Sequence, residues 1–423
     1  MKEEFVQGCA SLCRYLQDPH RVAGFQQLCG VRAAVPRKHN GHCPQEEREL
    51  GAEDDPDQST CSWTQAEGAE ETLTGLPKPD GGSRVKRKPF RKNSLTGDTG
   101  QEFIIKNKFL FYLFTLGTEL GNEMFFILFF PFLMWNVDAY VSRRIIMVWV
   151  WVLFLGQSTK DLVRWTRPAS PPVVKVEVFY NSEYSMPSTH AMSGTAVPFS
   201  MFLLTYGRWE YPFLIGLSMA FCWSLLVCLS RVYMGMHSVL EVISGFLYSI
   251  MILVILQPML DDLDIFYLNN RYAPLVVVVS HLSLGLLSFS LDSWSTSRGD
   301  TAQALATGAG AALASHLNHQ LGLQSDLPLS QLPLTMPSVN IILVGRSLSR
   351  LLVGLPVLLV TRAVMKALTI PLACWLFGVA SDDVRQARQH PAVELLYRFL
   401  VYGTVGFSCV SLVPSLFDLL NLS

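Results

Sequence analysis

Charged residues are scarce in this chain of 423 residues, and their signs nearly cancel. Asp, Glu, Lys and Arg make up 16% of the sequence, hydrophobic residues make up 50%, and the formal net charge is −1. Without a net positive charge, the chain has no general attraction to nucleic acid, so no nucleic-acid partner is expected. The apolar excess, with a mean hydropathy of +0.30, predicts a protein that crosses a membrane several times.

Metal-binding and secretion signals are also missing. The nine cysteines form no CxxC pair and no Cys/His pattern with zinc spacing, so we expect free thiols, no metal site and no other cofactor. The first residues contain no apolar run of the signal-peptide kind. Entry into the membrane is therefore expected from an internal segment that begins near Phe109.

The composition divides the chain into three parts. Residues 1–102 are rich in Gly, Pro, Ser, Glu and Asp, which predicts a disordered tail, and the tail ends in a basic juxtamembrane cluster at 84–92. Residues 103–257 are expected to form the catalytic core in the membrane, and 258–423 to add further transmembrane helices. The predicted fold is an all-α polytopic transmembrane bundle of about eight to ten spans.

Apolar segments follow one another from residue 103 onward. They lie at approximately 109–135, 145–159, 193–207, 213–230, 239–257, 273–291, 302–321, 339–361, 367–380 and 398–420. Glu119 and Glu123 interrupt the first of them, which indicates satisfied buried carboxyls, a broken span or a re-entrant element. The Ala- and Gly-rich segment 302–321, with His316 and His319, favours close helix packing over a metal site.

Three polar clusters stand at the ends of these segments. They are Lys160 to Pro168, Pro187-Ser-Thr-His190, and Ser230-Arg231 followed by His237 and Glu241. The first cluster follows one crossing and the second precedes the next crossing, at 193–207. That crossing leads to the opposite face, and the following one, at 213–230, brings the third cluster back to the first face. Since an additional crossing would separate two clusters by ~30 Å, this parity allows all three to converge at one membrane interface.

The residue types of the clusters suit phosphate chemistry. Lys160, Arg167 and Arg231 supply positive charge, and Ser188 and Ser230 supply hydroxyl groups, which together can bind a phosphate dianion and its transition state. Peptide N–H groups at the start of the helix near 193 can add further donors. Taken singly, each cation also fits a membrane-interface anchor.

The histidines and the glutamate can perform the reaction itself. His237 and Glu241 are spaced i, i+4, so the carboxylate can hold one imidazole nitrogen and leave the other as a nucleophile. His190 would protonate the leaving alkoxide and later activate water. Taken singly, a histidine at a helix start also fits a cap or a packing residue. The set as a whole predicts hydrolysis through a phosphohistidine without an obligatory metal.

These residues resemble the lipid phosphate phosphatase superfamily, also called type 2 phosphatidic acid phosphatases, whose motifs are KxxxxxxRP, PSxH and SRxxxxxHxxxD. Within it, the sequences around 178–190, 230–237 and 291–300 are similar to the sphingosine-1-phosphate phosphatases, and closer to the type 1 members than to type 2. The resemblance runs from about Phe103 to the C-terminus.

The resemblance implies roles for eight residues. The catalytic residues are His237, His190 and Glu241, and the phosphate-binding residues are Lys160, Arg167, Ser188, Thr189 through its backbone, and Arg231. It also implies a multi-pass protein of the endoplasmic reticulum membrane whose substrates are sphingosine 1-phosphate and its dihydro and phyto relatives. The family motif ends in Asp where this chain has Glu241, and the added methylene would move the carboxylate by about 1 Å.

Two questions stay open at this level. The basic cluster and two crossings before Lys160 favour a cytosolic site, whereas the resemblance implies a lumenal one. The alternatives to hydrolysis are transfer of the phosphoryl group to a lipid alcohol, and a membrane protein that only binds a lipid headgroup.

Overall fold

The computed structural model describes residues 2–33, 103–177, 183–291, 297–323, 326–327, 329–338, 340–380 and 384–422. In these ranges the chain is almost entirely helical, and its one sheet is the antiparallel pair of β1 (Val31–Ala33) and β2 (Phe103–Ile105). The basic cluster at 84–92 and the rest of the predicted tail from residue 34 lie outside the described residues.

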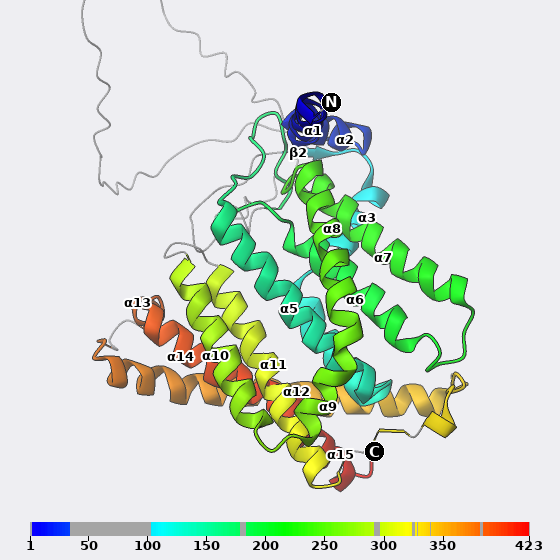
Figure 1. The fold of residues 1–423 in the computed structure, drawn as a ribbon, viewed down its shortest axis with the longest axis vertical. Coiled ribbons are helices and arrows are strands. Elements are labelled where there is room, and N and C mark those ends of the chain that lie inside the picture. The colour runs from blue at the N-terminus through cyan, green and yellow to red at the C-terminus, as the bar shows by residue number, and fades with distance from the viewer. Residues whose placement is uncertain are drawn as a thin grey trace, which may run out of the picture. The chain divides into compact units, whose positions relative to one another are not determined.

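The helices run in the following order (Figure 1). They are α1 (Lys2–Gln17), α2 (Pro19–Leu28), α3 (Lys108–Glu119), α4 (Glu123–Asn136), α5 (Ala139–Val163), α6 (Thr189–Thr205), α7 (Phe213–Tyr233), α8 (Val239–Leu256), η1 (Gln257–Met259), α9 (Leu260–Asn269), α10 (Ala273–Leu291), α11 (Ser297–Gln320), η2 (Leu329–Gln331), α12 (Ile341–Phe377), α13 (Val384–Ala387), α14 (Pro391–Phe407), η3 (Ser408–Leu412) and α15 (Val413–Leu419).

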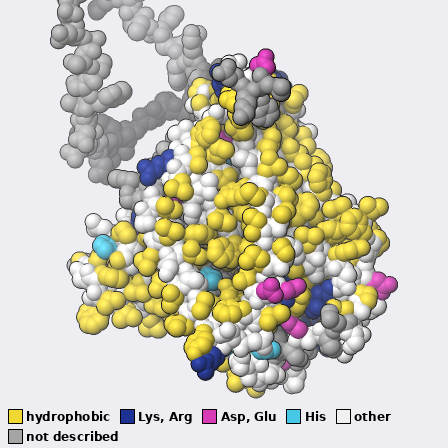
Figure 2. All heavy atoms as spheres, in the orientation of Figure 1, with side chains coloured by type: hydrophobic (Ala, Val, Ile, Leu, Met, Phe, Trp, Pro, Cys, Tyr) yellow, Lys and Arg dark blue, Asp and Glu magenta, His cyan; other side chains and the backbone are white. Residues whose placement is uncertain are grey.

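The all-α polytopic architecture is confirmed, with fewer spans than the eight to ten expected. Among the described helices, six are long and apolar enough to cross a membrane, or seven if α3 and α4 form one bent span. The predicted segments 339–361 and 367–380 are one helix, α12. Figure 2 shows a face on which hydrophobic side chains predominate and charged ones are few, as contact with lipid requires.

The first predicted span is broken. Helices α3 and α4 meet at an angle of 65°, and Gly121 lies in the break against α6 and α7. A Cβ at Gly121 would lie 2.8 Å from Cγ1 of Val227 and 3.3 Å from the backbone oxygen of His190, so only glycine allows this approach. The break, which the glutamates indicated in the sequence, thus lies against the first turn of α6.

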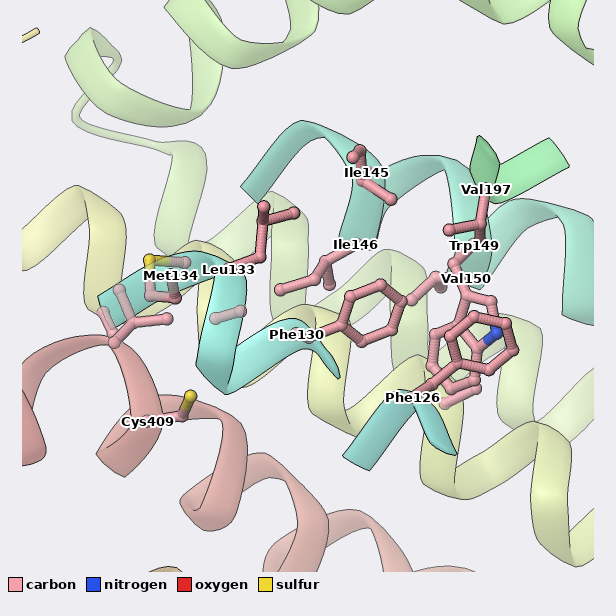
Figure 3. Packing of buried hydrophobic residues seen from close by; sticks show 14 of the residues in the cluster. Phe126, Phe130, Leu133, Met134, Ile145, Ile146, Trp149, Val150, Val197 and Cys409 are labelled. Atoms are coloured by element: carbon pink, nitrogen blue, oxygen red, sulfur yellow. The ribbon is translucent and has the colours of Figure 1, made fainter. Parts of the chain in front are cut away.

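An aromatic core joins α4 to α5 below this break. The ring centroids of Phe126 and Phe130 lie 5.8 and 5.3 Å from that of Trp149, and Figure 3 shows these rings packed with Ile146 and Val150. Helix α11 also contacts α5 and packs closely against α14, where a Cβ at Gly310 would lie 1.9 Å from the backbone oxygen of Gly403. Close packing of the Ala- and Gly-rich segment is therefore confirmed.

Residues 2–33 differ from the expected disordered tail. They form α1, α2 and β1, which pack onto α8, α7 and β2. The fully buried side chain of Gln26 donates to the backbone oxygens of Val174 and Tyr233 and accepts from the backbone N–H of Val174. One buried amide thus satisfies three backbone groups, which the average composition of 1–102 does not reveal.

The two ends of the bundle can be identified from these contacts. Helix α2 and β2 lie at the end where α7 finishes, whereas Asp138, the N-cap of α5, accepts a hydrogen bond of 2.6 Å from Arg208 at the opposite end. The chain therefore runs from one end of the bundle to the other through α3 and α4 and returns through α5. Lys160 thus lies at the same end of the bundle as residues 2–33.

Candidate active site

The helix ends bring the three clusters together at one end of the bundle. Lys160 lies in the last turn of α5, His190 in the first turn of α6, and Arg231 in the last turn of α7. Nη1 of Arg167 lies 3.4 Å from Nε2 of His237, which joins the first cluster to the third. The convergence expected from parity is present.

The three cations are buried and partly neutralised by two glutamates. Lys160 and Arg231 are 2% and 0% exposed. Nζ of Lys160 lies 3.2 Å from Oε2 of Glu183, and Nη1 of Arg231 donates to Glu177 at 2.8 Å. Buried cations need such partners because desolvation is costly. The sequence reasoning did not identify either glutamate, and nothing in the motifs points to them.

Arg231 keeps free donors. Its Nε and Nη2 atoms are buried and have no hydrogen-bond partner among the described residues. Buried guanidinium N–H groups are almost always paired in folded proteins, and two neighbouring N–H groups match two oxygens of a phosphate. Arg231 is therefore the residue of this cluster that is best placed to bind an anion.

The start of α6 completes the cationic cluster. Ser188 is the N-cap and accepts from the N–H of Ala191, and its own N–H donates to the backbone oxygen of Glu241. Oγ1 of Thr189 accepts from Lys160 at 3.0 Å, a side-chain contact added to the backbone role expected for it. The positive end of the helix dipole faces the cluster. Ser230 differs from expectation, because its hydroxyl donates to Val227 within α7.

His237 and Glu241 form the predicted pair. Nδ1 of His237 lies 3.1 Å from Oε2 of Glu241, and both side chains are buried. The same oxygen accepts from Ser185 Oγ and from the N–H of Ser238 at 3.1 Å, which closes a capping box at the start of α8. Ser185, which the sequence reasoning missed, also lies 3.3 Å from Nδ1 of His237.

This arrangement defines the protonation of the imidazole. A carboxylate at Nδ1 favours the tautomer with its proton there, so the lone pair of Nε2 faces Arg167. Burial lowers the pKa of His237 well below its ordinary value of 6.5, and the charges of Arg167, Arg231 and Lys160 lower it further. At neutral pH the imidazole is thus uncharged, as a nucleophile must be.

Two hollows adjoin the site. One, of about 310 Å³, lies between the N-terminal helices and residues 165–169, and its lining includes Arg14, Arg167 and Glu241. The other, of about 20 Å³, is lined by Thr189, His190 and side chains from α4, α5 and α11. The site is therefore bordered on one side by the N-terminal helices and on the other by the interior of the bundle.

Comparison with known proteins gives consistent matches. The profile of the PAP2 superfamily matches residues 144–263, which contain all three clusters. The chain is 51% identical to mouse "Sphingosine-1-phosphate phosphatase 1" over 99% of both chains, and 36% identical to human "Sphingosine-1-phosphate phosphatase 2" over 98% of this chain and all of the relative. A "Dihydrosphingosine 1-phosphate phosphatase" of Schizosaccharomyces pombe is 30% identical over 33% of this chain and 36% of its own. No solved structure matches the chain.

Proposed function

The chain belongs to the sphingosine-1-phosphate phosphatase family of the PAP2 superfamily, and from this premise we propose that its site hydrolyses sphingosine 1-phosphate and related long-chain base phosphates through a phosphohistidine. The relatives' names support the substrate class. The observation that carries the mechanism is the orientation of the His237 imidazole, whose Nδ1 contacts Glu241 and whose Nε2 lies 3.4 Å from Arg167 in the cationic cluster.

In the first step Nε2 of His237 attacks phosphorus. The bond from phosphorus to the lipid oxygen breaks, and His190 gives its proton to that oxygen, releasing the free base. Lys160, Arg167 and Arg231 stabilise the charge on the phosphoryl oxygens, with help from Ser188 and the peptide N–H of Thr189. Glu177 and Glu183 give up their contacts with the cations when the phosphate enters.

In the second step His190 takes a proton from water. The oxygen of that water attacks phosphorus, the bond to His237 breaks, and inorganic phosphate leaves. The hollow of about 310 Å³ reaches Arg167 and Glu241 and offers a route for water and phosphate. Because the side chains supply the charge that a metal would otherwise provide, activity should not need a divalent cation.

The test uses purified protein in mixed micelles with a chelator present. Phosphate release from sphingosine 1-phosphate is expected for the wild type and absent for His237→Ala, and an inactive wild type would overturn the proposal. A competing lipid alcohol in the same assay separates hydrolysis from transfer, because transfer would give a new lipid phosphate in place of inorganic phosphate.

The location is a further part of the proposal. The chain is a multi-pass membrane protein, and the family resemblance supports the endoplasmic reticulum as its membrane. Co-fractionation of a tagged chain with endoplasmic reticulum markers is expected, and enrichment in another membrane would contradict it.

A further inference from the structure

The smaller hollow beside His190 has polar walls in the interior of the bundle. Its lining includes Glu123 from the start of α4, Gln157 and Trp149 from α5, and Asp300 from α11, together with Glu183. A volume of about 20 Å³ admits one water-sized polar group. Three of its lining residues also belong to the proposed active site, namely Glu183 and Thr189 in the phosphate-binding cluster and His190 as the proposed acid. The hollow therefore adjoins the active site.

Glu123 has no ion-pair partner among the described residues that line this hollow. Asp300 contacts Arg398 and Gln303, and Glu183 contacts Lys160. Glu123 makes no hydrogen bond or ion pair to any side chain in the described part of the molecule. A carboxylate at membrane depth is expensive and usually serves binding or transport. The hollow thus has an excess of negative charge next to a cluster with an excess of positive charge.

Two buried polar atoms point independently to a missing ligand. Gln157 and Trp149 are 4% and 8% exposed, and Oε1 of Gln157 and Nε1 of Trp149 have no partner within the described ranges. An unpaired acceptor and an unpaired donor cost free energy in a buried place. A group carrying N–H or O–H and an oxygen would satisfy both.

We propose that this hollow binds the ammonium group of the long-chain base, with Glu123 and Gln157 as its principal acceptors, and that it selects amino-alcohol phosphates over lipid phosphates without an amine. This inference rests on the proposed function. In a sphingoid base phosphate the nitrogen is separated from the ester oxygen by two carbon atoms. If His190 protonates that oxygen, the ammonium group lies within two carbon atoms of His190, which also lines the hollow.

The ammonium group suits the acceptors of this hollow. It donates to carboxylate and amide oxygens, and such charge-assisted hydrogen bonds are strong in a low dielectric. A phosphate monoester of a simple alcohol has no ammonium group and would leave Glu123 unpaired.

The experiment compares two substrates in the same mixed micelles, sphingosine 1-phosphate and hexadecyl phosphate. For Glu123→Gln, the ratio of kcat/KM for the amine substrate to that for the alkyl phosphate should fall by about 10- to 100-fold. Gln157→Leu should lower the ratio by roughly 3- to 10-fold through loss of one acceptor. The matched control is Glu119→Gln, since Glu119 is exposed, contacts Asn122 and lies outside the hollow, and it should leave the ratio unchanged.

The outcomes separate this inference from the proposed function. A wild type that hydrolyses both substrates, with a ratio that neither variant changes, overturns the ammonium site and leaves the phosphatase intact. Equal losses on both substrates also overturn it, since they indicate a purely structural role. A wild type that hydrolyses neither substrate overturns both proposals.

Discussion

The carboxylate of Glu241 has two roles, since it holds the imidazole of His237 and caps the start of α8. It accepts from Nδ1 of His237 at 3.1 Å and from the N–H of Ser238 at 3.1 Å, with Ser185 as a third donor. A capping box at the start of a helix calls for Glu at its fourth position. The longer side chain reaches both the cap and the imidazole, so the departure from the family's Asp does not remove the contact with His237.

Substitutions of Glu241 should separate its charge from its length. Glu241→Gln keeps the size but orients the imidazole poorly and cannot stabilise positive charge on it, so kcat is expected to fall by about 10²- to 10⁴-fold. Glu241→Asp restores the family residue but shortens the reach, and kcat should fall by about 10-fold, with a loss of up to about 1 kcal/mol from the cap. Steady-state kinetics and thermal unfolding measure both effects. An Asp variant as active and as stable as the wild type would contradict the dual role.

The lowered pKa of His237 predicts the acid limb of the pH profile. The nucleophile must be uncharged, and burial next to cations keeps it so down to a pH below its ordinary 6.5. Protonation of His237 should therefore lower kcat/KM only below pH 6.5. The ionisation of the substrate phosphate, measured by ³¹P NMR in the same micelles, is divided out first. If the acid limb still has its midpoint at or above pH 6.5 after the substrate ionisation is divided out, the account is contradicted.

At the scale of elements, α2 fixes the segment that carries Arg167 to the end of α7. Gln26 bonds to both Val174 and Tyr233. Gly235, at a φ of +72°, lies so close that a Cβ there would be 2.3 Å from the oxygen of Val174. This contact lies two residues before His237, so we expect it to help position the proposed nucleophile.

Replacing Gln26 tests this contact. Gln26→Met keeps the length of the side chain and leaves three buried backbone groups without partners, which should lower the free energy of unfolding by about 2–4 kcal/mol and reduce kcat. Gln27→Met, at a neighbouring exposed position, is the control and should change neither. Thermal unfolding in detergent and phosphate release are the measurements. Wild-type stability in the Gln26 variant would show that α2 does not hold the site.

The sequence predicted the convergence of the clusters because each motif directly adjoins an apolar segment, and the parity of crossings is independent of packing detail. It missed α1 and α2 because single long-range contacts, such as those of Gln26, hold them to the bundle. Such contacts leave no periodic pattern in the sequence. Ser185, Glu177 and Glu183 were missed for the same reason. The hollow beside His190 forms only where α4, α5 and α11 pack together. That packing is tertiary structure, which the sequence pattern does not reveal.

At the scale of the whole molecule, the site and residues 2–33 lie at the same end of the bundle, so we predict that they lie on one side of the membrane. A lumenal site, which the resemblance implies, therefore requires a lumenal N-terminal segment. Cys9 is exposed on α1. In sealed vesicles, an impermeant maleimide should label Cys9 only in those vesicles whose orientation also lets the site hydrolyse an impermeant phosphate ester. A Glu210→Cys variant, at the opposite end, should show the reverse. Accessibility of Cys9 and the site from opposite sides would contradict the crossing pattern.

The central claim is that the phosphoryl group passes through His237, and rapid-quench labelling tests it most directly. Wild-type protein is mixed with ³²P-labelled sphingosine 1-phosphate, quenched in alkali within the first turnover, and digested for peptide mapping. The account predicts an alkali-stable, acid-labile phosphate on the peptide that contains His237, and its absence in His237→Ala. Turnover without any labelled protein, or a label on another residue, would contradict it.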